Sequence, residues 1–131
     1  MTPEAIFARV WQHAIVEDHD CCYLYAGSEI EPYYYHPAKP DQHCWTGLFI
    51  PPEAYSRGIE HRGLNDLLDE DGEFPRVAAV FRDWEPKALD LLRALQQAHD
   101  DCCGLSRAVR RERLWALAYQ HQVGLALVNP R

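Results

Sequence analysis

Two short segments of this chain place histidine, aspartate and cysteine side by side. The first cysteine segment (residues 19–22, His-Asp-Cys-Cys) and the second (residues 99–103, His-Asp-Asp-Cys-Cys) contain four of the five cysteines. Imidazole and thiolate are ligands that suit zinc and similar divalent metals. If the two segments converge, a metal site is expected, with an aspartate as a further ligand or as a partner that orients a histidine. Its predicted ligands are His19, Cys22, His99 and Cys103.

Two other interpretations of these segments remain open. Adjacent cysteines are not the spacing of structural zinc sites, and one cysteine of each pair would equally pack as a small apolar side chain. A disulfide would join the segments if the Cα atoms lie within roughly 7 Å. Both segments are predicted at the C-terminal ends of helices, where the helix dipole does not activate a thiol.

The fifth cysteine, Cys44, follows His43 and is a candidate nucleophile. Neighbours in a strand point to opposite faces, so a catalytic pair would need another histidine, His36 or His61. We expect Cys44 to face the core instead.

Tyrosine is concentrated between residues 23 and 35, and Trp45 follows shortly after. Alternation in a strand would send Tyr33 and Tyr35 to one face and Tyr34 to the other. One face would pack on helices, and the other would bind a ligand or partner or stabilise the sheet through aromatic pairs. The predicted binding residues are Tyr23, Tyr25, Tyr33, Tyr35 and Trp45.

The elements that would position these residues follow from periodicity. Thr2 and Pro3 begin a predicted helix over residues 3–17, with apolar residues at three- and four-residue steps. Alternation and turn residues predict three strands that follow one another as an antiparallel meander. The predicted strands cover residues 21–26, 30–35 and 44–50.

The second half of the chain is predicted to be mainly helical. A short helix over residues 63–69, a helical segment after Pro75, a longer helix from Pro86 to the second cysteine segment and a last helix from Ser106 to about Gln122 are expected. Gly124 would end the last helix, and residues 125–128 would form a short strand. The predicted fold is one α+β domain over residues 1–131. In it, a sheet of three or four antiparallel strands packs on one face against the N-terminal and C-terminal helices.

Charges are segregated in the later part of the chain. An acidic run over residues 66–73 precedes an arginine cluster at the start of the last helix. Cations at a helix N-terminus oppose the dipole, so they need compensation. The acidic run, a bound anion or an acidic partner would supply it.

Composition limits the classes of partner and location. The chain of 131 residues has a formal net charge of −7, which disfavours nucleic acid and anionic lipid as partners. No signal peptide or membrane-spanning run is apparent, so a cytoplasmic protein with reduced thiols is expected. The predominance of arginine over lysine indicates a bacterial, GC-rich origin.

Three functional hypotheses follow. The preferred one is a noncatalytic module, expected to be a homodimer without a cofactor, that binds a ligand or protein through the tyrosine-rich sheet. The second is a small metal-dependent or thiol enzyme that uses the cysteine segments, with zinc as the metal. The third is an acidic inhibitor or immunity-type protein. Phosphate-binding loops, nucleophile elbows and HExxH motifs are missing from the sequence, which favours the first hypothesis.

Overall fold

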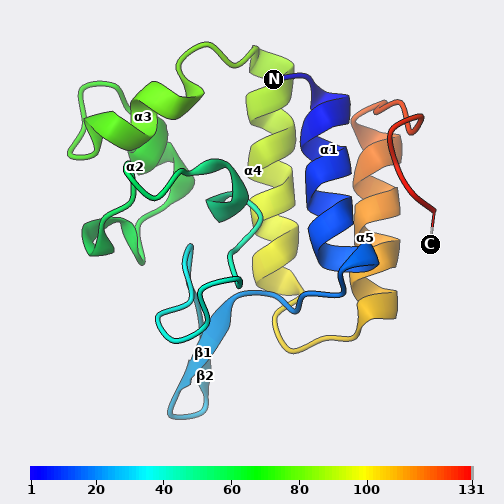
Figure 1. The fold of residues 1–131 in the computed structure, drawn as a ribbon, viewed down its shortest axis with the longest axis horizontal. Helices are drawn as coiled ribbons and strands as arrows, with labels where there is room; N and C mark the ends of the chain where they lie inside the picture. The colour runs from blue at the N-terminus through cyan, green and yellow to red at the C-terminus, as the bar shows by residue number, and fades with distance from the viewer. Residues whose placement is uncertain (131) are drawn as a thin grey trace.

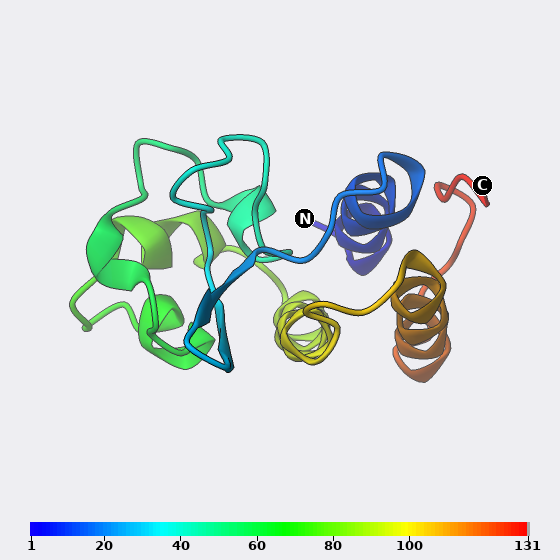
Figure 2. The ribbon, with the colours of Figure 1, turned by 90° about the horizontal axis from the view of Figure 1, so that it is seen from below.

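The computed structural model describes residues 1–130, which divide into a helical half and a loop-rich half (Figure 1). Three long helices form the helical half and appear end on as a triangle in Figure 2. They are α1 (Pro3–Trp11), α4 (Pro86–Asp101) and α5 (Arg107–Gln120). The loop-rich half comprises residues 18–85. Its regular elements are β1 (Tyr23–Ala26), β2 (Glu29–Pro32), α2 (Leu64–Leu68), α3 (Pro75–Phe81) and two 3-10 turns, Gly47–Phe49 and Arg57–Ile59.

Helix α1 begins as its sequence predicts. The Thr2 hydroxyl accepts a hydrogen bond from the backbone N–H of Ala5 at 3.1 Å, and Pro3 occupies the first helical position. The continuation differs from the prediction of one α-helix to residue 17, because Gln12–Val16 forms a π-helical turn. The N–H of Glu17 bonds the Gln12 carbonyl at 2.9 Å. This wider turn is rare in proteins and frequently lies at functional sites.

Apolar packing holds the helical half together. Trp11 of α1 and Trp115 of α5 have ring centroids 4.6 Å apart, and the Arg111 guanidinium lies over both rings. The predicted caps of the later helices are confirmed in part. Ser106 caps α5 by accepting from the N–H of Val109, but the left-handed residue after α5 is Gln122 (φ 53°) and not Gly124.

A second apolar cluster lies in the loop-rich half. The short helices α2 and α3 contribute Leu67, Val77 and Phe81 to it, and Leu92 of α4 reaches it from the helical half. Cys44 is fully buried in this cluster, as expected. The cluster is framed by loops, so few of its contacts follow a regular helical or strand period.

The mixed α+β class is confirmed, but the sheet has two strands and not three or four. Strands β1 and β2 form an antiparallel hairpin in which Tyr23 faces Pro32 and Tyr25 faces Ile30. After Pro32, pairing is reduced to one isolated bridge between Tyr35 and His43. The hairpin extends beyond the C-terminal end of α4 and is not covered by α1 (Figures 1 and 2).

The predicted third strand, residues 44–50, is a turn. Its N–H groups bond within the segment, from Leu48 to Cys44 and from Ile50 to Gly47. Gly47 explains this conformation, because a Cβ there would lie 2.3 Å from the carbonyl oxygen of Tyr34. The backbone approaches too closely for an ordinary strand residue.

The predicted strand over residues 125–128 is also a turn, closed by a bond from the N–H of Val128 to the Leu125 carbonyl. All four residues are apolar, and no strand within residues 1–130 pairs with them. Within residues 1–130, no helix combines the length and the apolar character needed to cross a membrane.

The arginine cluster of α5 is compensated by residues that the sequence did not indicate. Arg110 is 4% exposed and donates to the Asp18 carboxylate at 2.7 Å, with Asp20 at 3.5 Å. Arg113 lies 3.9 Å from Asp101. The acidic run instead pairs Glu70 with Arg82 and Glu73 with Arg62. The acidic run and the arginine cluster therefore do not pair with each other in these ion pairs.

Candidate functional site

Two of the predicted tyrosines line a cavity in the loop-rich half, which we call the tyrosine pocket. Its volume is about 510 Å³, within the range of small-molecule sites. Three short segments provide the walls: the chain after β2, the 3-10 turn near residue 57, and the residues that follow it. The lining residues are Tyr33, Tyr35, His36, Pro37, Tyr55, Arg57, Glu60 and His61.

Glu60 organises the tyrosine pocket from inside. Its carboxylate accepts the backbone N–H of Tyr34 at 2.7 Å and that of Tyr35 at 3.1 Å. The hydroxyl of Tyr55 donates to the same carboxylate at 2.8 Å. These bonds satisfy N–H groups that a third strand would otherwise have paired with. Hydrogen bonds to a charged carboxylate are stronger than those between neutral groups. One side chain thus holds two of the pocket walls together.

The aromatic rings of the pocket are arranged in contact with one another. Tyr35 and Tyr55 stack with centroids 4.0 Å apart and planes within 4°. The edge of His43 meets Tyr35, and Tyr33 and His61 meet edge to face at 5.0 Å. His61 has a φ of 64°, in the left-handed region that ordinary residues avoid. Such strained residues concentrate at functional sites.

The phenols of the pocket are poor acids. Burial raises the pKa of Tyr55, and the hydrogen bond to Glu60 raises it further. Burial and the nearby Glu53 charge raise the pKa of Tyr35 as well. Burial and the charge of Lys39 lower the pKa of His36, whose Nδ1 accepts two backbone N–H bonds. The pocket therefore offers neutral aromatic surfaces and not activated bases or nucleophiles.

The other predicted binding residues lie elsewhere. Tyr23 and Tyr25 are in the hairpin, where their rings meet edge to face, and Tyr25 is exposed. Trp45, predicted on a sheet face, is fully buried and meets His99 edge to face. Because residues 44–50 form a turn, the indole points into the helical core. Trp45 therefore offers no surface to a ligand.

The two cysteine segments do meet in space. The backbone N–H of Cys22 donates to Nε2 of the buried His99 at 2.9 Å, and the Nδ1 of His99 is 2.9 Å from the Asp100 carboxylate. Nε2 is the acceptor, so Nδ1 carries the ring proton and donates it to Asp100. Both nitrogens of His99 are therefore engaged within the protein. This contact fastens the hairpin to the end of α4.

The predicted metal ligands are thus divided between two places. The thiol of Cys22 donates to the Gln42 carbonyl at 3.6 Å, and that of Cys103 donates to the His99 carbonyl at 3.5 Å. His19 instead joins another group. Within residues 1–130, the three-ligand group contains His19 but not Cys22, His99 or Cys103.

The thiols are buried, free and unactivated. All five cysteines are unpaired, and burial raises the pKa of Cys22 to about 12. The pKa of Cys21 is raised chiefly by a hydrogen bond to Cys103 and then by burial, and that of Cys44 is raised well above its usual value by burial. Because the thiolate is the reactive form, this environment does not favour a thiol enzyme.

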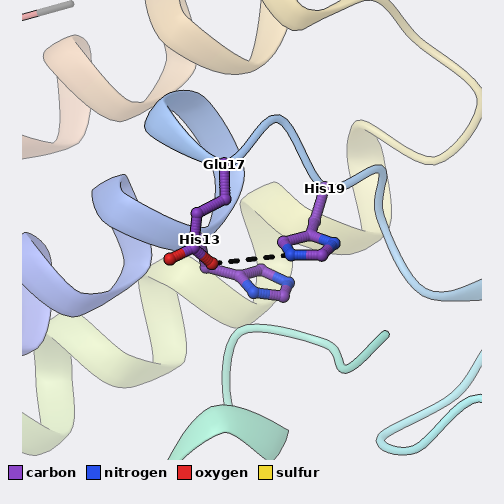
Figure 3. A group of neighbouring side chains, drawn as sticks. All are labelled: His13, Glu17 and His19. Atoms are coloured by element: carbon purple, nitrogen blue, oxygen red, sulfur yellow. Dashed lines mark ion pairs between the residues drawn. The ribbon is translucent and has the colours of Figure 1, made fainter. Parts of the chain in front are cut away.

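The group that His19 joins is the histidine cluster, which consists of His13, Glu17 and His19 (Figure 3). One ligand atom from each residue lies within 4.8 Å of the others. The His13 and His19 rings stack with centroids 4.3 Å apart, and Nε2 of His19 is 3.5 Å from the Glu17 carboxylate. The π-helical turn positions His13, and Glu17 ends that turn.

Four residues of these sites were not predicted from the sequence: His13, Glu17, Tyr55 and Glu60. His13 and Glu17 are four residues apart in the first helix, a spacing that places them on one face, so a signal was present. Tyr55 and Glu60 lie in a segment without periodicity, and nothing in the sequence tied them to Tyr34 and Tyr35. Their contacts span 5 to 26 residues.

Comparison with known proteins found no match among family models, curated protein sequences or solved structures. The function is therefore argued from the geometry described above.

Proposed function

We propose that this protein is a noncatalytic binding module whose tyrosine pocket takes a small aromatic molecule with an anionic group. One observation carries the proposal: the stacked rings of Tyr35 and Tyr55 line the same pocket as Arg57, a cation that no ion pair holds among residues 1–130. The pocket has the size of a ligand site, and its phenols are not set up for acid–base chemistry.

The aromatic wall favours a flat ligand. Tyr35 is covered on one side by Tyr55 and contacted by His43 on another, so it is fixed in place. Within the described part of the chain, the opposite face of Tyr55 makes no ring contact. Tyr33 stands across the pocket, held at its edge by His61. A planar ring would stack on Tyr55 with little loss of side-chain entropy, because the wall is already ordered.

The charges favour an anionic substituent. The Glu60 carboxylate already accepts three hydrogen bonds, so much of its capacity is used inside the protein. Arg57 also lines the pocket and is exposed, and no ion pair holds it among residues 1–130. Its planar guanidinium matches a carboxylate in a bidentate geometry. The ligand class that fits is an aromatic carboxylate.

A titration followed by ¹H–¹⁵N NMR tests this proposal with benzoate, uncharged benzamide and cationic benzyltrimethylammonium as probes. We expect benzoate to shift the Tyr33 and His61 resonances saturably and to bind more tightly than benzamide. Arg57→Gln should weaken benzoate binding roughly tenfold, about 1.4 kcal/mol, whereas the matched control Arg76→Gln should not. Equal binding to Arg57→Gln, preference for the cation, or no binding by any probe would overturn the proposal.

A second function, self-association, is favoured by an exposed patch on the hairpin. Tyr25, Ile30 and Leu105 are 64%, 40% and 42% exposed. Gly104 joins them, since a Cβ there would lie 3.7 Å from the Tyr25 hydroxyl and 3.8 Å from Ile30. Adjacent apolar side chains of this kind mark interfaces, so we propose a homodimer through this patch.

Light scattering on the full chain tests the dimer. The wild type should have the mass of two chains, and Tyr25→Ser with Ile30→Ser should have the mass of one. A wild type that is monomeric at all concentrations would remove this second function. The inhibitor hypothesis stays a prediction.

A further inference from the structure

We propose that His13, Glu17 and His19 form a binding site for one divalent transition-metal ion of the zinc type. The inference is independent of the tyrosine pocket and uses a different part of the chain. It assigns to the histidine cluster a chemistry that the two cysteine segments were predicted to provide, with His19 as the one shared residue.

The first observation is an unsatisfied imidazole. His13 is 3% exposed, and its Nε2 is buried without a hydrogen-bond partner in the described part of the chain. Burying an unpaired polar atom costs free energy, so a buried nitrogen of this kind calls for a partner, such as a bound ion. Nε2 is also one of the two atoms through which histidine binds metals.

The second observation is the set of donors beside the His13 ring. Two imidazoles and one carboxylate, with one ligand atom of each within 4.8 Å of the others, are the donor types of catalytic zinc sites with an open position. Nitrogen donors favour zinc or cobalt over calcium and magnesium, which prefer oxygen.

The third observation is that the protein fixes the chain around the cluster. The N–H of His19 bonds the His13 carbonyl at 3.1 Å, and Asp18 has a strained φ of 53°. The buried Arg110 of α5 donates to Asp18 at 2.7 Å and lies 3.5 Å from Asp20. The two residues that flank His19 are therefore held from a distant helix. This arrangement fixes the backbone of His19 beside His13.

One ring must turn to bind the ion. Imidazole lone pairs lie in the ring plane, and the two planes are stacked within 15°, so one ion cannot lie in both planes as they stand. His19 is one-third exposed and its side chain has room to rotate, whereas His13 is enclosed. Glu17 is exposed, and its carboxylate accepts a hydrogen bond from the Gln12 amide at 3.3 Å and pairs with His19, so it can move with the His19 ring.

Two nearby groups affect this site in opposite ways. Nδ1 of His43 is a second buried nitrogen without a partner in residues 1–130, and the charge of His43 acts on the pKa of His13. It provides another donor atom in the same neighbourhood. Arg9 opposes a cation, but its side chain is exposed and its charge is screened by solvent.

Calorimetric titration of Zn²⁺ into the untagged full chain, purified with chelator and then freed of it, tests the site. We expect one ion per chain. Glu17→Gln and His19→Asn, both at partly exposed positions that should leave the fold intact, are each expected to weaken binding roughly tenfold or more. His13→Asn should do the same if it folds. The matched control His121→Asn, at the far end of α5, should bind as the wild type does.

Cobalt absorption identifies the ligand atoms independently of affinity. Bound Co²⁺ should show bands of nitrogen and oxygen ligation without a thiolate charge-transfer band, and Cys22→Ser with Cys103→Ser should leave the spectrum unchanged. Absence of Zn²⁺ binding, full affinity in both Glu17→Gln and His19→Asn, or a thiolate band that the serine variants remove would each overturn the proposal.

Discussion

The helical half and the loop-rich half are stabilised in different ways. Helices α1, α4 and α5 pack apolar side chains that recur at helical spacing, and the buried Trp11 contacts the partly buried Trp115. The loop-rich half has its own apolar cluster, but its backbone is fixed by single side chains that bond distant N–H groups. Glu60 bonds Tyr34 and Tyr35, Gln96 bonds Thr46, and His99 bonds Cys22.

This difference explains where the candidate sites lie. Where side-chain hydrogen bonds fix the backbone in place of a β-sheet, the neighbouring side chains are free to line a cavity. The tyrosine pocket lies entirely in the loop-rich half, and the histidine cluster lies where α1 gives way to it. The helical half supplies rigid anchors, including Arg110 and His99, for elements that have little regular structure of their own.

The largest expected effect is in the helical core. Leu95→Ala removes a fully buried side chain of α4 and should lower the free energy of unfolding by about 3–4 kcal/mol. Urea denaturation measures it, with the exposed Leu127→Ala as the control, for which a change below about 0.5 kcal/mol is expected. A small loss at Leu95 would show that apolar packing is not what holds this half.

Acid should act at the junction of the two halves. The pKa of His13 is near 6.5 in the unfolded chain and about 3 in the fold, so the unfolded state takes up the proton first as the pH falls. The contribution of His13 to the free energy of unfolding is complete above pH 6.5. It should fall by about 3 kcal/mol by pH 4. Urea midpoints from pH 7 to 4 for the wild type and His13→Asn measure it. Equal pH slopes in the two proteins would contradict the assignment.

In the loop-rich half, Glu60→Gln should lower the free energy of unfolding by about 2 kcal/mol. An amide cannot accept both backbone N–H bonds, and hydrogen bonds to a charged acceptor are worth about 1.5–3 kcal/mol. The exposed Glu53→Gln is the matched control and should be near neutral. Chemical denaturation gives both values. A neutral Glu60→Gln would mean that apolar contacts alone fix this half, and the contrast between the halves would fail.

The smallest effect is expected for Arg93 of α4, an exposed side chain that joins the two halves at the surface by a hydrogen bond. Arg93 of α4 lies 3.2 Å from Asp90 and donates to Asn65 of α2 at 3.0 Å, but the side chains are exposed. Arg93→Ala should change stability by no more than about 0.5 kcal/mol, and high salt should remove even that. A loss comparable to that of Glu60→Gln would show that surface charges join the halves.

The predictability of the fold follows the same division. The helices were predictable because their apolar spacing, their prolines and the Thr2 and Ser106 caps act over a few residues. The prediction of a third strand over residues 44–50 was wrong, because the backbone at Gly47 lies too close to that of Tyr34 for an ordinary strand. The π-helical turn was equally hidden, since its sequence is compatible with an ordinary helix.

The candidate sites were predictable only in part. Tyr33 and Tyr35 were identified by tyrosine density, but Glu60, which positions them, has no local signature. Whether the cysteine segments meet was left open by the sequence; they do meet, through a bond from a backbone N–H to an imidazole nitrogen. The partner of His19 proved to be His13, because Arg110 and the π-helical turn bring those rings together.

Hydrogen exchange at Tyr34 and Tyr35 tests the contrast between the halves most directly. Their amides lie outside the hairpin and the helices and, among residues 1–130, bond only the Glu60 carboxylate. We predict that they are protected to a degree comparable with the interior amides of α4, and that Glu60→Gln removes this protection while α4 keeps its own. Exchange at the rate of an unstructured chain in the wild type, with α4 still protected, would contradict the account.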